Sequence, residues 1–170
     1  MIDFTEFFGS HIITSIKEFL VTEQCPIPWR GMDLYLIRDQ NVVFYIGQSS
    51  LAYDRLWQHL FDGYKGRSSV GRFILVNWRS SMNFTIELFS SLMSGFQDYQ
   101  NNPNRIEKYL IELTCPCFNS ALNKHPTTLP DYYNPPDRPV RNVRSMRRMI
   151  RVASYVIKAE KRKAWSDPMR

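Results

Sequence analysis

Hydrophobic positions in the first third of the chain change from a helical spacing to two short continuous runs. Residues 3–20 repeat large apolar side chains near the helical period, which predicts an amphipathic helix packed against a core. Residues 25–31 contain two prolines and predict a loop. The apolar runs 33–39 and 41–47 are joined by the turn-forming sequence Asp-Gln-Asn, which predicts a β-hairpin.

The middle of the chain alternates between helical and strand-like patterns. Residues 52–62 gather their apolar side chains on one face and predict a helix. Residues 68–79 fit a helix capped by a serine at position 68 or 69, although their apolar run also suits a strand. Residues 83–89 alternate and predict a strand. A further helix is expected over 102–115, because its Asn-Pro start suits an N-cap followed by the first helical position.

The end of the chain combines an extended arm with a basic helix. Residues 126–139 hold five of the ten prolines, which excludes a helix or a central strand there. Residues 143–163 predict an amphipathic helix with a basic side. Its apolar stripe comprises Val143, Met146, Ile150, Ala153 and Ile157. Its basic side holds Arg144, Arg147, Arg148, Arg151, Lys158 and Arg162.

Length and composition fit one globular domain with additional elements. The chain has 170 residues, of which 44% are hydrophobic and 22% charged, so wholesale disorder is excluded. We expect an N-terminal helix and loop over 1–30, a central domain over 31–123, a proline-rich arm over 124–140 and the basic helix over 141–165. The sequence lacks both a long apolar run and a basic leader, so we expect neither a membrane span nor a secretory signal. Three cysteines make a disulfide framework unexpected and favour a cytoplasmic location.

The net charge of +6 is unevenly distributed. Residues 138–170 contain eleven Lys or Arg and two acids, a local charge of +9, which leaves −3 on the rest of the chain. Such asymmetry favours a polyanionic partner, either nucleic acid or an anionic membrane surface. A role in solubility alone is the alternative.

Residues with chemical potential are ordered along the hairpin and the helix after it. Tyr35 and Tyr45 lie on neighbouring predicted strands, so their hydroxyls can converge on one site. Gly47 follows at the strand end, where a glycine permits the close approach of a backbone or a ligand. Arg55 and His59 are four residues apart, hence on one helical face, and together suit a phosphate.

Two further residues come from the helix that begins at the Asn-Pro step. Glu107 lies on this helix, and Asn119 follows twelve residues later. Each residue alone has a plainer reading: a core tyrosine, a solvated Arg–His pair, a surface carboxylate or a turn asparagine. The order and spacing of all of them together favour a site.

This array resembles the GIY-YIG nuclease family. The first triplet is Asp33-Leu-Tyr35 and the second is Tyr45-Ile-Gly47, followed by Gln-Ser and by the Arg and His just described. The run from Glu107 to Asn119 is similar to the family's helix with its Glu, its Leu-Ile step, its Pro and its closing Asn. The resemblance spans residues 33–119, 87 positions in all. Asp33 departs from the family's pattern, where the first triplet begins with glycine.

The resemblance implies an α/β (α+β) fold, with a small three-stranded, mainly antiparallel sheet flanked by helices. To these the chain adds the N-terminal helix and the basic C-terminal helix. The resemblance also implies metal-dependent hydrolysis of DNA, with Glu107 binding Mg²⁺ or Mn²⁺ and Arg55 stabilising developing charge. Tyr35 is implied as general base, with Tyr45 and His59 assisting and Asn119 holding the geometry.

Contacts to DNA are expected around the site and along the basic helix. Near the site the candidates are Gly47, Gln48, Lys65, Arg67 and Arg72. On the helix they are Arg141, Arg144, Arg147, Arg148 and Arg151. The partner is expected to be duplex DNA of particular sequence or branched DNA, at the nucleoid if the source is bacterial, and the oligomeric state stays open.

Two other functions remain open from the sequence. One is a nucleic-acid-binding module of the same fold with weak or no catalysis, which the Asp33 departure favours. The other is an interaction protein whose basic helix lies on a membrane or on an acidic partner. The presence of every candidate catalytic group favours the enzyme.

Overall fold

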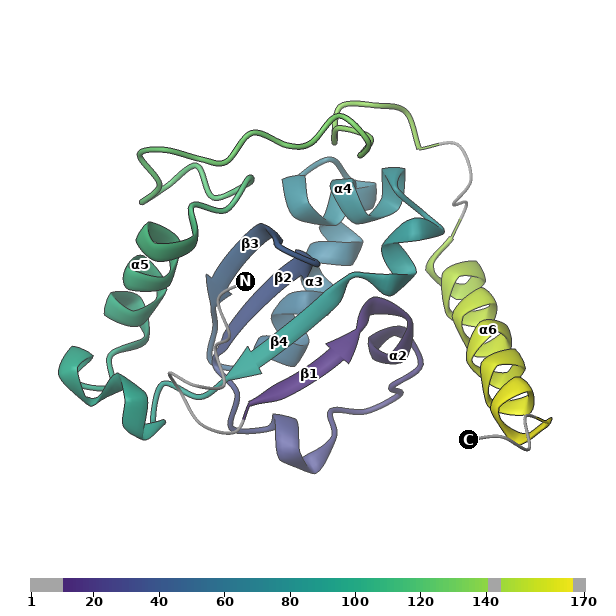
Figure 1. Cartoon of the computed structure of the whole chain (residues 1–170), viewed down its shortest axis with the longest axis horizontal. Helices are drawn as coiled ribbons and strands as arrows, with labels where there is room; N and C mark the ends of the chain where they lie inside the picture. Colours follow the sequence, from purple (N-terminus) through teal and green to yellow (C-terminus); the bar gives the residue numbers. More distant parts are fainter. Residues whose placement is uncertain (1–10, 141–144, 167–170) are drawn as a thin grey trace.

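A four-stranded antiparallel sheet forms the centre of the computed structural model, which describes residues 11–140 and 145–166 (Figure 1). The strands are β1 (Ile12–Ser15), β2 (Leu34–Asp39), β3 (Val42–Gln48) and β4 (Thr85–Phe89), in the order β1-β4-β2-β3. The α+β class is therefore confirmed. The expectation of three strands is wrong, because β1 pairs with β4 and adds a fourth.

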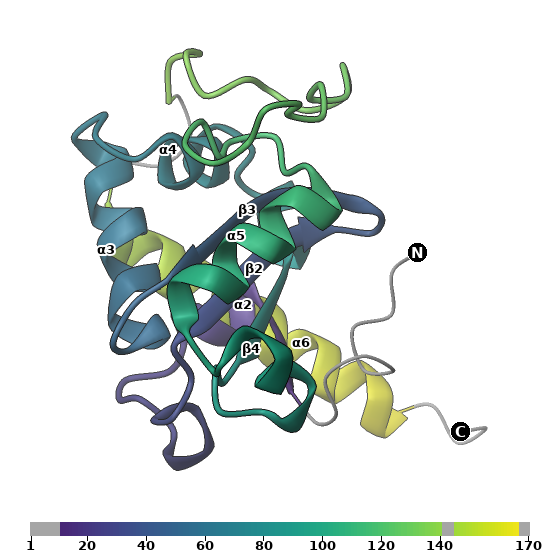
Figure 2. The same ribbon diagram turned by 90° about the vertical axis from the view of Figure 1, so that its left-hand side faces the viewer.

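Helices cover both faces of this sheet (Figures 1 and 2). The α-helices are α2 (Ile16–Leu20), α3 (Ala52–Tyr64), α4 (Ser69–Val76), α5 (Pro103–Thr114) and α6 (Met146–Ser166). Three short 3₁₀ helices in the described residues are η1 (Ile27–Trp29), η2 (Ser80–Asn83) and η3 (Ser94–Tyr99). Among the described residues, no helix combines the length and the hydrophobicity needed to cross a membrane.

The helix expected over residues 3–20 is confirmed over 16–20, which form α2, and is wrong over 12–15. Residues 1–10 lie outside the described residues, and 12–15 form strand β1. Two isoleucines and a threonine favour an extended backbone, and the edge of β4 supplies their hydrogen-bond partners. The helix begins only after Ser15, whose hydroxyl caps it in a reciprocal capping box with Glu18.

The sheet separates two hydrophobic clusters. On one face Ile37, Phe44 and Ile86 pack with α2, α3, α4 and α6. On the other face Leu36 and Ile46 pack with η3 and α5. Each face therefore has its own helical cover, and a residue's position along a strand decides which cover it meets.

An irregular register in the hairpin changes this alternation in β3. Ile37 pairs with Tyr45, and Arg38 pairs with Val43, so Phe44 has no partner of its own on β2. This bulge turns the consecutive residues Phe44 and Tyr45 toward the same cluster. Tyr45 consequently lies on the same face of the sheet as Tyr35.

Helices α3 and α4 cross at two glycines. A Cβ atom on Gly63 would lie 2.5 Å from the Gly71 carbonyl carbon, and one on Gly71 would lie 1.8 Å from the His59 carbonyl oxygen. The missing side chains let the two backbones touch. The start of α4 is thereby placed directly against His59.

The arm and the final helix follow the central domain. In the arm, Tyr133 donates to the Asp39 carboxylate at 2.7 Å, and Asn134 exchanges hydrogen bonds with Asn77. The basic helix is confirmed as α6, although it begins at Met146 rather than at residue 141 or 143. Arg141 and Arg144, candidates for DNA contact, lie outside the described residues.

Replacing Gly71 with alanine tests the helix crossing. The added methyl group would overlap the His59 carbonyl, so we expect the G71A variant to lose about 3 kcal/mol of unfolding free energy. Urea unfolding followed by circular dichroism measures this loss. The matched control is G31A, because no atom lies within 4 Å of that position, and its change should stay within about 0.5 kcal/mol. Equal stability of the two variants would contradict the described crossing.

Candidate active site

Three aromatic rings from two strands and one helix form the centre of the site. The ring centroids of Tyr35 and Tyr45 lie 6.1 Å apart, and the His59 ring lies 5.8 Å and 5.1 Å from them. The Tyr35 hydroxyl oxygen lies 2.7 Å from His59 Nε2. These three residues were expected in one site, and the structure brings them together.

Gly47 is required by this arrangement. It pairs with Tyr35 across the hairpin. A Cβ at position 47 would lie 2.4 Å from the Tyr35 hydroxyl oxygen and 2.9 Å from the Tyr45 ring. The absence of a side chain therefore lets the tyrosine ring lie across the strand. In the structure, Gly47 leaves room for the ring of Tyr35.

Arg55 and Glu107 place opposite charges next to the two tyrosines. Burial raises the pKa of Tyr35 and of Tyr45, nearby Glu107 raises both further, and the Arg55 guanidinium opposes these shifts. Arg55 is half-buried, and its Nη1 donates to the Gln58 side chain at 2.6 Å. Both phenols are neutral at pH 7, beside one cation and one carboxyl group.

His59 is a neutral imidazole held at both nitrogens. Burial, with the Arg55 charge, lowers its pKa to about 4. Its Nδ1 lies 2.8 Å from the Ser68 hydroxyl oxygen, which also accepts the Gly71 backbone N–H at 3.0 Å. Ser68 is the N-cap of α4, as the sequence suggested, but its contact with His59 was missed. Only the close crossing of α3 and α4 creates that contact, and no sequence spacing signals it.

Asn119 holds the backbone of β3 rather than the rings themselves. Its Oδ1 accepts the Ile46 N–H at 2.9 Å, and its Nδ2 donates to the Ile46 carbonyl at 2.7 Å. The two residues before it donate to the carbonyls of Val43 and Phe44. The segment 117–119 therefore extends the outer edge of β3 and fixes the strand that carries Tyr45 and Gly47.

Glu107 offers one half-buried carboxyl group to a metal. Burial raises its pKa, and a backbone hydrogen bond from Gln48 partly offsets that effect. The Gln48 side chain in turn donates to Asn104 at the start of α5. In the described part of the chain, no three His, Cys, Asp or Glu residues gather as a metal-ligand group. A single carboxylate fits Mg²⁺, which keeps several waters and takes further oxygens from phosphate.

Asp33, the departure from the family's pattern, is hydrogen-bonded to the loop after β4. Its carboxylate accepts the Ser91 backbone N–H at 2.7 Å and the Ser91 hydroxyl at 2.5 Å. These bonds join the start of β2 to the loop after β4. The extra carboxylate therefore has a structural partner.

Family models, curated proteins and solved structures were all compared with the chain. None of them matches it.

The candidate DNA-contact residues fall into two groups. Lys65 and Arg67 are exposed after α3, and three arginines are exposed on α6, namely Arg147, Arg148 and Arg151. Arg72 instead donates to the carbonyls of Pro136 and Arg138 and so attaches the arm to α4.

His11 has a partner on the opposite face of the sheet. Its Nε2 lies 2.9 Å from the Glu87 carboxylate, which also accepts from the Arg38 guanidinium. Glu87 is almost fully buried, so these two partners offset the loss of its hydration. This cluster joins the residue before β1 to β4 and β2, on the face of the sheet opposite the three rings.

The pKa of His59 predicts a pH-dependent stability. An unfolded histidine has a pKa near 6.5, so the unfolded chain takes up a proton that folded His59 refuses until about pH 4. The contribution of neutral His59 to the free energy of unfolding is therefore fully present above pH 6.5. It is lost as the pH falls toward 4, and the loss amounts to about 3 kcal/mol in all. Urea unfolding at several pH values measures how the free energy of unfolding depends on pH. The slope of this dependence should be shallower for H59Q than for the wild type. H125Q, a change of an exposed histidine, should keep the wild-type slope.

Proposed function

We propose that this protein is a metal-dependent DNA endonuclease that hydrolyses phosphodiester bonds at a single-metal site of GIY-YIG type. The observation that carries the proposal is the cluster of the Tyr35, Tyr45 and His59 rings, to which Arg55 of α3 and Glu107 of α5 lie close enough for their charges to act on both phenols. Phosphodiester hydrolysis needs a proton acceptor for water, a cation for the phosphoryl oxygens and a hard-oxygen metal ligand. This cluster contains one group for each requirement.

The raised pKa of Tyr35 decides how a phenol can serve as the base. A preformed phenolate is unfavourable in this buried position. We propose that the neutral phenol relays a proton instead. Its oxygen accepts the proton of the attacking water as its own proton passes to His59 Nε2, 2.7 Å away. The water oxygen forms its bond to phosphorus, and the leaving alkoxide oxygen departs with the electrons of the broken P–O bond.

The other groups hold charge and geometry. Arg55 stabilises the negative charge that develops on the phosphoryl oxygens. Glu107 would hold Mg²⁺ or Mn²⁺, which supplies Lewis-acid neutralisation of the phosphate and of the leaving oxygen when bound. Tyr45 lines the position of the water, and Asn119 holds the strand beneath it. The protonated imidazole returns to neutrality by giving its Nε2 proton back to the Tyr35 oxygen, as the proton that Tyr35 took from the attacking water passes to a solvent water molecule.

A binding module without catalysis is the second candidate. It drew its support from Asp33, because a carboxylate at the start of the strand alters the approach of phosphate or the affinity for metal. Ser91 gives the Asp33 carboxylate a structural role but leaves its negative charge in place. The enzyme is the better proposal because the site contains every candidate catalytic group.

Replacing Glu107 tests the nuclease directly. We expect E107Q to nick supercoiled plasmid at least about a hundredfold more slowly than the wild type in Mg²⁺, because the carboxylate ligand is lost. Agarose-gel conversion of supercoiled to open-circle DNA measures the rate, with EDTA as the metal-free control. The matched variant E112Q alters an exposed carboxylate on the same helix and should cleave normally. Wild-type rates from E107Q would sink the proposed site.

Replacing Ser68 tests the proton relay. We expect S68A to cleave about tenfold more slowly, because His59 Nδ1 loses the partner that fixes its tautomer. Loss of the N-cap also removes about 1 kcal/mol of stability, so the assay needs a temperature well below unfolding. S68T keeps the hydroxyl and should restore the rate. A merely structural serine would leave the shape of the pH–rate profile unchanged, whereas a relay role shifts its acidic limb.

A further inference from the structure

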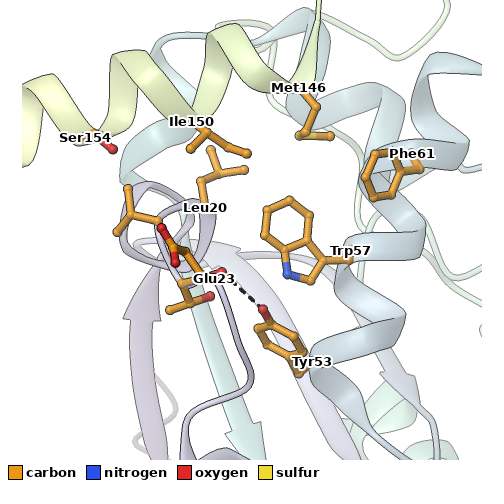
Figure 3. Close-up of a pocket in the computed structure, with 10 residues that line it drawn as sticks. Leu20, Glu23, Tyr53, Trp57, Phe61, Met146, Ile150 and Ser154 are labelled. Carbon is orange, nitrogen blue, oxygen red and sulfur yellow. Dashed lines mark hydrogen bonds between the residues drawn. The ribbon is translucent and has the colours of Figure 1, made fainter.

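A hollow of about 530 Å³ lies where α6 meets α2 and α3 (Figure 3). One wall is aromatic and comes from Tyr53, Trp57 and Phe61, at every fourth position of α3. The opposite wall comes from Met146, Ile150 and Ser154, at every fourth position of α6. The hollow has the size and apolar lining typical of small-molecule sites.

Basic side chains border the hollow along α6. Arg147 and Arg151 each follow a lining residue of α6 by one position, and Lys158 and Arg162 continue the same side of the helix. All four side chains are exposed. Among the ion pairs of the described residues, none involves these four. They form a ridge of cations about 22 Å long, at the helical rise per residue.

Another aromatic residue, Trp165, lies at the C-terminal end of this ridge. Trp165 is 91% exposed and lines a shallow hollow with Lys161 and Arg162. At the near end, Phe61 is 51% exposed and its ring lies 6.1 Å from that of Trp57. Exposed aromatic rings thus stand at both ends of a row of cations.

We propose that this surface, the α6 track, binds single-stranded nucleic acid. The cations Arg147, Arg151, Lys158 and Arg162 contact successive phosphates, and unpaired bases stack on Trp57 with Phe61 at one end and on Trp165 at the other. A duplex offers phosphates but keeps its bases paired, so it leaves the two aromatic ends unused. Glu23, at the mouth of the hollow, supplies an acceptor for a base N–H group.

The apolar side of α6 argues against a membrane as the occupant. A helix that lies on a bilayer presents its apolar face to the lipid. In α6 that face holds Met149 and Ala153, which are fully buried in the core, and Glu160 pairs with Lys17 of α2 at 2.7 Å. The protein itself therefore covers the side that a lipid would need.

The track also extends the proposed function, on which this step rests. Arg55 and His59 lie on one side of α3, and Trp57 and Phe61 lie on another side of the same helix. A DNA strand bound in the α6 track would thus run past α3, the helix that carries Arg55 and His59. The substrate class that follows is DNA with an unpaired segment, such as a flap or a branch.

Binding of fluorescein-labelled oligo(dT) to the full chain tests the track. The measurement uses E107A protein in EDTA, so that cleavage plays no part, and records anisotropy from 50 to 200 mM salt. We expect W165A and F61A to bind at least about fivefold more weakly with an unchanged salt slope. R151Q should reduce the magnitude of the slope of log K against log salt by about 0.7, which is the contribution of one phosphate contact to a single strand. K124Q, a change of an exposed cation in the arm, is the matched control.

The outcomes separate this proposal from the nuclease. Equal affinity for duplex and single strand, with no effect of W165A, would overturn the track, as would binding to phosphatidylserine vesicles but not to oligo(dT). W165A keeps the test decisive if F61A disturbs packing, because Trp165 is almost fully exposed. Wild-type protein that binds oligo(dT) but never nicks DNA in Mg²⁺ would refute the nuclease and leave the track standing. Nicking without oligo(dT) binding would do the reverse.

Discussion

Close backbone contact without side chains is the constraint on which the site depends. Gly47 lets the Tyr35 ring lie across β3, and Gly71 lets α4 touch α3 at His59. Because both contacts end on the pair formed by Tyr35 and His59, the 2.7 Å distance between their polar atoms is fixed from two directions. A looser approach at either glycine would separate the phenol from the imidazole. The hydrogen bond between the phenol and the imidazole therefore depends on close packing at both glycines.

The sheet contributes a second condition, namely which face each side chain occupies. Regular alternation would place Phe44 and Tyr45 on opposite faces of β3. The bulge turns both toward the same hydrophobic cluster, so that Phe44 packs against Phe73 of α4 and Tyr45 joins Tyr35 and His59. Asn119 binds the backbone one residue further along and keeps this irregular strand in place. The edge of β3 is thus covered by the segment that follows α5 and offers fewer free backbone groups to another chain.

Local patterns in the sequence were sufficient where one element determines the outcome. The hairpin, α3, α5 and the capped start of α4 follow from turn residues, periodicity and N-caps, and the structure confirms them. Strand β1 could not be predicted, because its isoleucines also fit a helical stripe and only the free edge of β4 decides between the two. The contact of Ser68 with His59 and the pairing of Asp33 with Ser91 depend on tertiary approach. Neither has a signal in residue spacing.

The basic helix shows how tertiary packing narrows a choice that composition leaves open. An amphipathic helix with a cationic side suits a bilayer, an acidic protein or a nucleic acid equally well in isolation. Docking of Met149 and Ala153 against the core uses its apolar side, so the face left to a partner consists of cations with aromatic rings near both ends. A lipid bilayer would need the apolar side of α6, which is buried. Phosphates and bases would need the cationic side, which is exposed. Because α3 supplies both one wall of the hollow and two residues of the candidate active site, the proposed nucleic-acid track on α6 and the proposed phosphate contact of Arg55 would share one structural support.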